Sequence, residues 1–310
     1  MTKTIVLLNP HAAGGKAAAL AEPMRLWLEK NSPQIALEIP DSVVNARLLI
    51  DALPQASRVV VVGGDGTLNQ LLPSLLKGAH TMALVPFGSG NDTARALGLY
   101  GLPWEKALVH GLTGAASQID IGMAEFDADA NDAVNGNSET RSVPFISSLT
   151  TGFDSSVGLR AFNGPKWLRG LPRYLLATVR ELVNFRTWTM QVSIDGALVH
   201  SGKALFASTL NTRTFGAGMP AVPHARIDDG ALNLLLARDI SLAQTLLLLP
   251  HLLIGKHLSH TKVHTQSFQA MQIESATPVP IAADGEYLGL SRIISIRVEA
   301  GRLAVVAATA

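Results

Sequence analysis

The first third of the chain alternates short apolar runs with longer segments of helical spacing. The run of four valines at 59–62 shows no polar alternation, which is typical of a strand buried on both faces. The expected strands are 5–8, 35–39, 59–62 and 82–85, and the expected helices are an alanine-rich one ending near 31, 43–53, 67–77 and one starting at 93–97. This order predicts an α/β domain with a parallel, doubly wound, Rossmann-like sheet.

After about Ser117 the pattern changes to short runs of strand-forming residues. Only 173–185 and 241–257 have convincing helical spacing there, and the polar stretch 126–141 is expected to be a hairpin tip. The expected strands are 118–123, 142–149, 189–194, 203–209, 231–236, 269–274 and 292–299. This pattern predicts a mainly antiparallel second domain over 118–299, after an α/β domain over 1–117.

The composition limits the classes of protein to which this chain can belong. The 310 residues suffice for two domains, and a net charge of +1 without a Lys/Arg block argues against a nucleic-acid partner. The absence of cysteine excludes disulfides and thiolate chemistry, and favours the cytoplasm. The apolar runs at 5–8 and 245–254 are too short for a signal peptide and for the ~20 residues that span a bilayer.

A glycine-rich turn follows the valine strand. Three of its residues are glycines, which tolerate tight turns and let a phosphate approach the backbone N–H groups, and Asp65 stands among them. The turn comprises Gly63, Gly64, Asp65, Gly66 and Thr67. Because a helix is expected to begin at Thr67, the turn predicts a phosphate cradle with one carboxylate, although such turns also occur without a ligand. It matches neither G-x-G-x-x-G nor a Walker loop.

Polar residues also follow two other expected strands. Asn9 comes directly after strand 5–8, and Asn91 follows strand 82–85. Ligands of doubly wound sheets bind beyond the carboxyl ends of the strands. We therefore expect Asn9, Asp65 and Asn91 to converge on one crevice.

Six segments resemble, in family order, the diacylglycerol kinase catalytic domain family, which includes bacterial lipid kinases and sphingosine kinases. They are N-P-H-A-A-G-G (9–15), V-V-V-V-G-G-D-G-T-L-N (59–69), P-F-G-S-G-N-D-T-A-R-A-L-G-L (86–99), T-G-F-D-S-S-V (151–157), A-R-I-D-D-G-A-L-N-L (225–234) and A-D-G-E-Y (283–287). The resemblance implies a nucleotide-binding domain over 1–117, a β-sandwich acceptor-binding domain over 118–299, and a return of residues ~300–310 to the first domain.

The same resemblance implies an enzyme that transfers the γ-phosphoryl group of ATP to a lipid hydroxyl with Mg²⁺. The expected nucleotide-binding residues are Asn9, Gly63, Gly64, Gly66, Thr67, Gly88, Ser89, Gly90, Asn91 and Asp92. The expected catalytic carboxylates are Asp65, Asp154, Asp284 and Glu286, and the expected metal ligands are Asp65, Asp228 and Asp229. Phosphoryl transfer needs charge neutralisation and a group that takes the proton of the alcohol.

The roles of these carboxylates stay open at the level of sequence. Asp65 is the first candidate for a role with the metal or the phosphates, and Glu286 or Asp154 is the first candidate for removing the proton of the alcohol. Ordinary structure would also explain several of them, because Asp-Gly is a preferred turn dipeptide and an aspartate can cap a helix.

A lipid substrate implies peripheral contact with the inner face of the membrane. Segment 160–186 interleaves arginines with aromatic and aliphatic residues, which suits an anionic membrane surface as well as a solvated helix face. Residues 246–254 would line an acyl pocket or form core, with core favoured. His257, His260 and His264 are expected at the surface rather than on zinc. The sequence leaves the oligomeric state open, a homodimer included.

Two other functions compete with the lipid kinase. NAD kinases also carry G-G-D-G-T, so the first loop alone does not exclude a nucleotide acceptor. The P-F-G-S-G-N-D-T-A-R segment looks like the lipid-kinase pattern. A non-catalytic nucleotide- or lipid-binding protein on the same fold is the third reading, because a fold does not entail a function.

Overall fold

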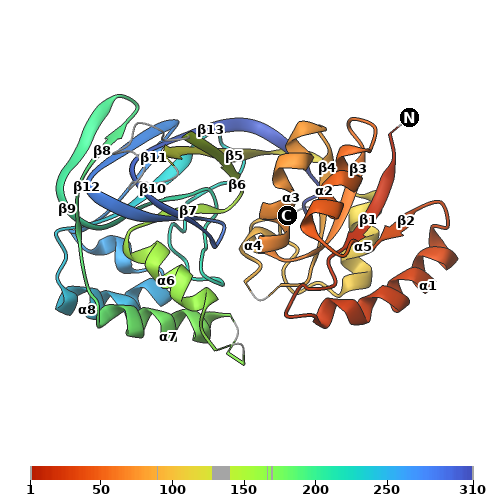
Figure 1. Ribbon diagram of the computed structural model, residues 1–310, viewed down its shortest axis with the longest axis horizontal. Coiled ribbons are helices and arrows are strands. Elements are labelled where there is room, and N and C mark those ends of the chain that lie inside the picture. Colours follow the sequence, from red (N-terminus) through yellow and green to blue (C-terminus); the bar gives the residue numbers. More distant parts are fainter. Residues whose placement is uncertain (1, 89, 128–139, 166, 169, 309–310) are drawn as a thin grey trace. The chain divides into compact units, whose positions relative to one another are not determined.

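The computed structural model describes the chain except Met1, Ser89, 128–139, Lys166, Arg169 and 309–310. Residues 128–139 of the expected hairpin tip and the expected nucleotide ligand Ser89 therefore lie outside the described residues. The chain forms two compact units (Figure 1), one of Met1–Ile119 with Gly301–Ala310 and one of Asp120–Ala300.

The first unit is built on a parallel sheet. Its strands lie side by side in the order β2 (Ala36–Glu38), β1 (Thr4–Leu8), β3 (Arg58–Gly63), β4 (Thr81–Pro86) and the end of β13 (Glu286–Val305). Every pairing is parallel, and the last one places Val305 opposite Met82. The expected doubly wound sheet is confirmed, and the chain end supplies its fifth strand.

Helices cover both faces of this sheet. On one face, α1 (Ala21–Asn31) and α5 (Trp104–Thr113) pack on Val6, Val60 and Ala83. The alternate residues of the same strands, such as Val59 and Val61, are also fully buried. The other helices of this unit are η1 (Lys16–Leu20), α2 (Val43–Asp51), α3 (Asp65–Lys77) and α4 (Asp92–Ala96). The valine run therefore lies in a strand without a wet face, as its pattern predicts.

The second unit is almost entirely antiparallel in its strand pairing. Its main path runs β11 (Val263–Phe268), β10 (Leu232–Arg238), β9 (Ala197–Leu210), β7 (Ser148–Thr151), β12 (Ala270–Ala283) and β13. β8 (Trp188–Ile194) also pairs with β9 and β12, while β5 (Ser117–Asp127) pairs with β13 and with β6 (Thr140–Phe145). The predicted change to an antiparallel β architecture is confirmed.

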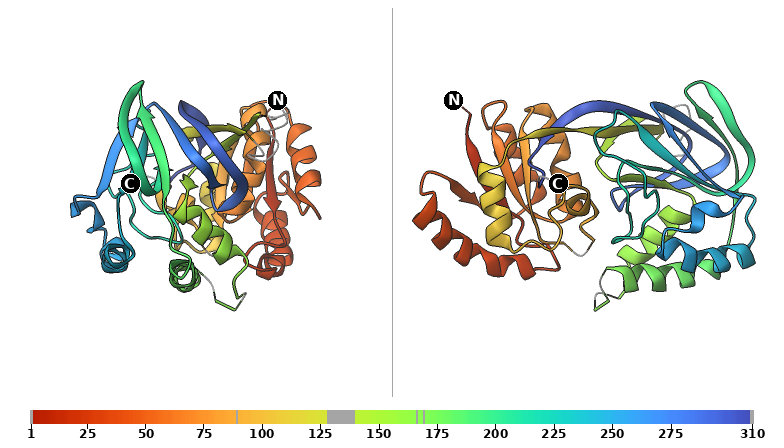
Figure 2. Two further views of the ribbon diagram at one scale, coloured as in Figure 1. Left: turned by 60° about the vertical axis from the view of Figure 1, so that its left-hand side comes forward. Right: turned by 180° about the vertical axis from the view of Figure 1, so that it is seen from behind.

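Within the described residues of the second unit, three helices and a short 3₁₀ turn lie on one side of the strands (Figure 1 and Figure 2). They are α6 (Phe153–Phe162), α7 (Leu171–Leu182), α8 (Leu242–Leu253) and η3 (His257–Ser259). The helices expected at 173–185 and 241–257 correspond to α7 and α8. α6 contradicts the expectation of only two helices in this part, and no described helix is long and apolar enough to cross a membrane.

Two boundaries differ from the expected ones in ways that matter for the site. The strand expected at 142–149 is divided into β6 and β7 at residues 146 and 147. The helix expected from Thr67 begins two residues earlier, so Asp65 is its first residue rather than the middle of a turn. Asp65 is therefore held by helical backbone.

Candidate functional site

In the first unit, two glycine loops touch backbone to backbone. Gly64 precedes α3 and Gly88 precedes α4, and a Cβ added to Gly64 would lie 2.7 Å from the Cα of Gly88. The backbone N–H of Phe87 also donates to the carbonyl of Gly63 at 2.7 Å. Glycine at these positions is therefore a packing requirement, because any side chain would push the loops apart.

The Asp65 carboxylate joins the two loops. Its Oδ2 accepts the backbone N–H of Asp92 at 3.0 Å, and its Oδ1 accepts that of Thr93 at 3.0 Å. These are the first N–H groups of α4, which have no acceptor within their own helix. Asp65 thus caps α4 from a distance, a structural role that the sequence did not indicate.

Asn9 and Asn91 complete this edge of the sheet. The Asn9 side chain donates to the Thr67 hydroxyl at 2.8 Å and accepts the N–H of His11 at 3.0 Å. Asn91 has a left-handed backbone with φ 57°, and its Nδ2 donates to the Gly88 carbonyl at 3.0 Å. The Asn91 Oδ1 is buried and has no hydrogen-bond partner among the described residues. An unpaired buried acceptor at this edge is suited to a ligand N–H or O–H group.

The structure therefore groups the predicted nucleotide-binding residues that it describes. Gly66 and Thr67 lie in the first turn of α3, Gly90 lies in the loop before α4, and Asp92 begins α4. The first N–H groups of α3 have no carbonyl acceptor within their own helix, so this helix terminus is suited to binding phosphate.

In the second unit, Asp284 supports the break between β6 and β7. Its carboxylate accepts three backbone N–H groups, from Ile146 at 2.9 Å, Ser147 at 2.7 Å and Ser148 at 3.0 Å. These three bonds occupy much of the acceptor capacity of the carboxylate. We infer that Asp284 shapes the backbone rather than removing a proton from substrate.

Glu286 has a different environment at the start of β13. It is half-buried, and none of the described residues makes a hydrogen bond or ion pair with its carboxylate. Burial raises the pKa of Glu286 above its ordinary value. A carboxylate with an elevated pKa and no protein partner can accept a proton from a bound alcohol.

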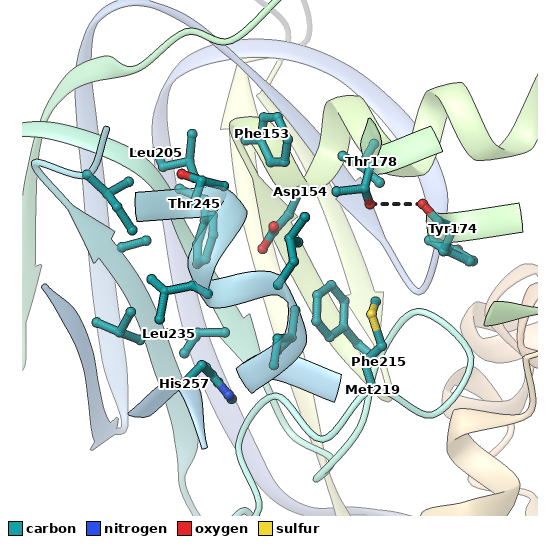
Figure 3. Close-up of a pocket in the computed structure, with 18 of the residues that line it drawn as sticks. Phe153, Asp154, Tyr174, Thr178, Leu205, Phe215, Met219, Leu235, Thr245 and His257 are labelled. Atoms are coloured by element: carbon teal, nitrogen blue, oxygen red, sulfur yellow. Dashed lines mark hydrogen bonds between the residues drawn. The ribbon is translucent and has the colours of Figure 1, made fainter. Parts of the chain in front are cut away.

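Asp154 lies in the first turn of α6 and faces an apolar pocket (Figure 3). Burial raises the pKa of its carboxyl to about 7, and the hydrogen bond from Ser208 Oγ at 2.9 Å opposes that rise. Asp154 is therefore a partly protonated acid at neutral pH. Its environment could not be recognised from the sequence, because Ser208 is 54 residues away.

The apolar pocket is enclosed by α6, α7, α8 and β9–β11. It has a volume of about 90 Å³. Its apolar lining includes Phe153, Val157, Leu205, Leu235, Leu248 and Leu252. The few polar lining residues are Asp154, Tyr174, Thr178, Thr245 and His257. His257 is 4% exposed and its Nε2 lies 2.8 Å from the Ala221 carbonyl oxygen, so the expectation of a surface histidine was wrong for this residue.

The predicted metal ligands of the second unit make protein contacts. Asp228 pairs with Arg226 at 3.2 Å, and Asp229 accepts the N–H of Ala231 at 3.2 Å. Among the described residues, no group of three His, Cys, Asp or Glu side chains forms that could hold a metal ion. A metal at Asp228 and Asp229 stays a prediction, and this pair alone offers fewer ligands than a dedicated site needs.

The arginines of segment 160–186 differ in their contacts and exposure. Arg160 Nε donates to Glu181 at 2.6 Å, and Arg173 Nη2 donates to the carbonyls of Phe162 at 2.7 Å and Gly164 at 3.2 Å. Arg173 therefore secures the connection between α6 and α7. Arg180 and Arg186 are exposed.

Two protein-family models match the chain. The model described as "Diacylglycerol kinase catalytic domain" matches residues 3–124, and the one described as "YegS C-terminal NAD kinase beta sandwich-like domain" matches residues 147–307. The two matched models define a phosphotransferase with an alcohol group as acceptor. The chain belongs to the diacylglycerol kinase catalytic domain family, with the YegS type of C-terminal domain.

Two relatives that are similar to this chain in sequence are named diacylglycerol kinases. The chain is 28% identical over 287 residues to a diacylglycerol kinase of Mycobacterium tuberculosis strain H37Rv, covering 92% of this chain and 89% of the relative. It is 26% identical over 241 residues to the diacylglycerol kinase of Bacillus subtilis strain 168, covering 77% and 74%.

Solved structures show the same fold. A diacylglycerol kinase from Bacillus anthracis str. Sterne has a TM-score of 0.67 at 16% identity, covering 98% of this chain and 96% of that one. An NAD kinase from Archaeoglobus fulgidus in complex with ATP has a TM-score of 0.53 at 10% identity, covering 97% and 92%. The predicted fold class, an α/β unit followed by an antiparallel β-sandwich, is thereby confirmed.

Proposed function

We propose that this protein is an ATP-dependent lipid kinase that transfers the γ-phosphoryl group to a hydroxyl of a diacylglycerol-like acceptor. The observation that carries this proposal is the apolar pocket of the second unit with the Asp154 carboxyl in its wall. An apolar pocket with a few polar groups suits a ligand that is a hydrocarbon chain with a polar end.

The first unit would bind the nucleotide at its paired glycine loops. Close backbone contact between Gly64 and Gly88 leaves no side chain over the start of α3, where the triphosphate would meet N–H groups and the helix dipole. The buried Asn91 Oδ1 would accept a hydrogen bond from the ribose or the base. Asn9 would orient the Thr67 hydroxyl from the other side.

Magnesium would enter with the nucleotide. Mg²⁺ is usually held by one or two carboxylates together with substrate phosphates and water, so it does not require a protein cage. Asp65 is the carboxylate of the first unit that would support it, because a carboxylate keeps acceptor capacity after two N–H bonds. The metal would neutralise the charge of the transferring phosphoryl group.

The contacts of each carboxylate support one choice for the group that takes the proton. The acceptor oxygen attacks the γ-phosphorus, the bond to the β-γ bridging oxygen breaks, ADP leaves, and the alcohol proton passes to a carboxylate. Glu286 suits this step, because burial raises its pKa and it has no partner among the described residues. Asp284 would hold the backbone beside it, and Asp154 would position the acceptor by a hydrogen bond.

Peripheral contact with a membrane would deliver the acceptor. Exposed apolar side chains on and near the helices of the second unit include Trp167 (79%), Leu247 (71%) and Ile254 (64%). Apolar groups beside exposed arginines suit the surface of an anionic leaflet.

We expect Leu246→Ser with Leu247→Ser to reduce sedimentation with anionic vesicles, because both side chains lie on the exposed face of α8.

The test is identification of the product by chromatography after incubation with ATP, Mg²⁺ and a panel of lipids in micelles, with NAD as a parallel acceptor. We expect a phosphorylated diacylglycerol-like product. Glu286→Gln should lower kcat by two or more orders of magnitude without lowering the melting temperature, because burial disfavours the charged carboxylate. Asp284→Asn should lower the melting temperature, since the amide offers N–H where three backbone donors need acceptors.

Two outcomes would overturn the assignment. A phosphorylated NAD without a lipid product would favour the NAD kinase reading, which the nucleotide loop alone permits. Hydrolysis or binding of ATP without any phosphorylated acceptor would favour a binding protein. The lining of the pocket supports a lipid over a dinucleotide, because most of its side chains are apolar.

A further inference from the structure

A second cavity in the Asp120–Ala300 unit has polar walls. Its volume is about 430 Å³, and it lies between α6, α7 and the β12–β13 strands. It shares no lining residue with the apolar pocket, although α6 and α7 contribute to both. Its principal polar lining residues are Ser156, Arg160, Asn163, Arg180, Arg186 and Tyr287. Ser156 and Arg160 come from one face of α6, and Asn163 follows directly as its C-cap.

The cavity carries an excess of positive charge. Arg160 Nε is paired with Glu181 at 2.6 Å, and that glutamate side chain is only 9% exposed. Arg180 and Arg186 have no carboxylate partner among the described residues. Two guanidinium charges therefore remain after the ion pair is counted.

Arg180 and Arg186 are exposed, and the groups around them add one aromatic contact and three neutral side chains that can form hydrogen bonds. Arg186 lies 4.9 Å from the centre of the Trp188 ring, a cation–π contact that restrains the guanidinium. Burial raises the pKa of the Tyr287 phenol and Arg186 opposes that rise; the neutral hydroxyl can donate a hydrogen bond. Ser156 and Asn163 add a hydroxyl and an amide.

We propose that this cavity binds a phosphate monoester group. A phosphate monoester carries close to two negative charges at neutral pH and three acceptor oxygens, which match two guanidinium groups and several neutral donors. A carboxylate or a phosphodiester carries one charge and would leave one arginine uncompensated. The planar fork of arginine suits phosphate oxygens in particular.

Two kinds of ligand carry a phosphate monoester group. A soluble phosphate ester would use the cavity alone. The headgroup of a phosphorylated lipid would also meet apolar side chains at the rim, where Leu290 is 40% exposed and Leu159 lines the wall. The proposal concerns a site apart from the nucleotide loops and the apolar pocket, and it does not rest on the proposed function.

The test compares binding by full-length variants. Calorimetric titration with glycerol 3-phosphate is the soluble arm. Sedimentation with phosphatidylcholine vesicles that contain phosphatidate is the lipid arm, and vesicles that contain phosphatidylglycerol at equal surface charge are the reference. The test variant is Arg180→Gln with Arg186→Gln. The matched control is Lys203→Gln with Arg238→Gln, which removes two exposed cations elsewhere in the same unit.

We expect the test variant to bind about tenfold or more weakly to the phosphate monoester in at least one arm, since charge-assisted hydrogen bonds are lost. The control should bind as the wild type does. Loss in the lipid arm alone identifies a lipid headgroup, and loss in the soluble arm alone identifies a phosphate ester. The test variant keeps the glycine loops of the first unit, so any binding that it loses relative to wild type is attributed to this cavity.

Three results overturn the proposal. The first is equal binding by wild type and test variant in both arms. The second is an equal loss in the control variant, and the third is equal binding to phosphatidylglycerol; both would indicate an effect of general surface charge. Circular dichroism checks the fold of each variant. Tyr287→Phe provides a milder second test that should weaken binding severalfold, because one neutral donor is removed.

Discussion

At the scale of single residues, the Asp154 carboxyl makes the stability of the protein depend on pH. Its pKa is about 7 in the folded protein and 3.8 as an ordinary aspartate, because burial disfavours the charge. Between these values the folded state binds one proton more than the unfolded state, so stability falls as pH rises from about 4 to about 7. A difference of about three pH units corresponds to at most about 4 kcal/mol.

Asp154→Asn removes this dependence. We expect the variant to be more stable than wild type at pH 8, by up to a few kcal/mol, and to differ little at pH 4 apart from the hydrogen bond with Ser208. Urea unfolding at several pH values measures it. A stability difference that stays constant from pH 4 to pH 8 would show that Asp154 ionises normally in the folded protein.

The sequence places these carboxylates in recognisable motifs but does not show what they contact. Asp65 and Asp284 stand in recognisable motifs, yet their acceptor oxygens are engaged by backbone N–H groups 27 and 137 residues away. Contacts over such separations have no local signature. Glu286 could be distinguished from Asp284 only after these partners were known.

At the scale of elements, the close approach of the β3–α3 and β4–α4 loops is the feature that builds the candidate nucleotide site. Gly64→Ala would bring a Cβ within 2.7 Å of the Cα of Gly88, and neither backbone can move without disturbing the capping of α4 by Asp65. We expect ATP affinity to fall at least tenfold and stability to fall by about 1–3 kcal/mol. Nucleotide titration and denaturant unfolding measure the two effects.

Gly158→Ala is the matched control for this substitution. Gly158 lies inside α6, and a Cβ added there meets no atom within 4 Å. The control should leave stability unchanged or raise it by about 0.5–1 kcal/mol, because alanine is the better helix former. Unchanged ATP affinity in Gly64→Ala would contradict the placement of the nucleotide at these loops.

Elements with a strong local pattern were predicted within a few residues, whereas others depend on distant parts of the chain. The valine strand is specified by its own β-branched residues. The expected strand at 142–149 is interrupted because the Asp284 carboxylate takes the N–H groups of Ile146 and Ser147 out of ladder pairing. The helix α6 buries Phe153, Val157 and Ala161 at a spacing of four residues, but it has only ten residues and contains Gly158, so its local pattern is weak.

At the scale of the whole molecule, the chain returns to its first unit at the end. Residues after Ala300 group with the first unit, where the end of β13 pairs with β4 and Val306 donates its N–H to the Met82 carbonyl at 2.9 Å. His110 Nε2 lies 2.9 Å from the Ala307 carbonyl oxygen. The family resemblance led to the expectation of this return, whereas hydrophobic pattern alone gives no reason to assign these residues to a strand of the first sheet.

The returning segment should therefore control the stability of the first unit. Leu303 is 1% exposed, so Leu303→Ala leaves a cavity that we expect to cost about 2–5 kcal/mol. Leu198→Ala serves as control, because Leu198 is 60% exposed and its removal should change stability by less than about 0.5 kcal/mol. Hydrogen exchange should show lost protection at Met82 and its neighbours in β4, with β10 unaffected. Equal loss in β10 would mean that the chain end stabilises both units alike.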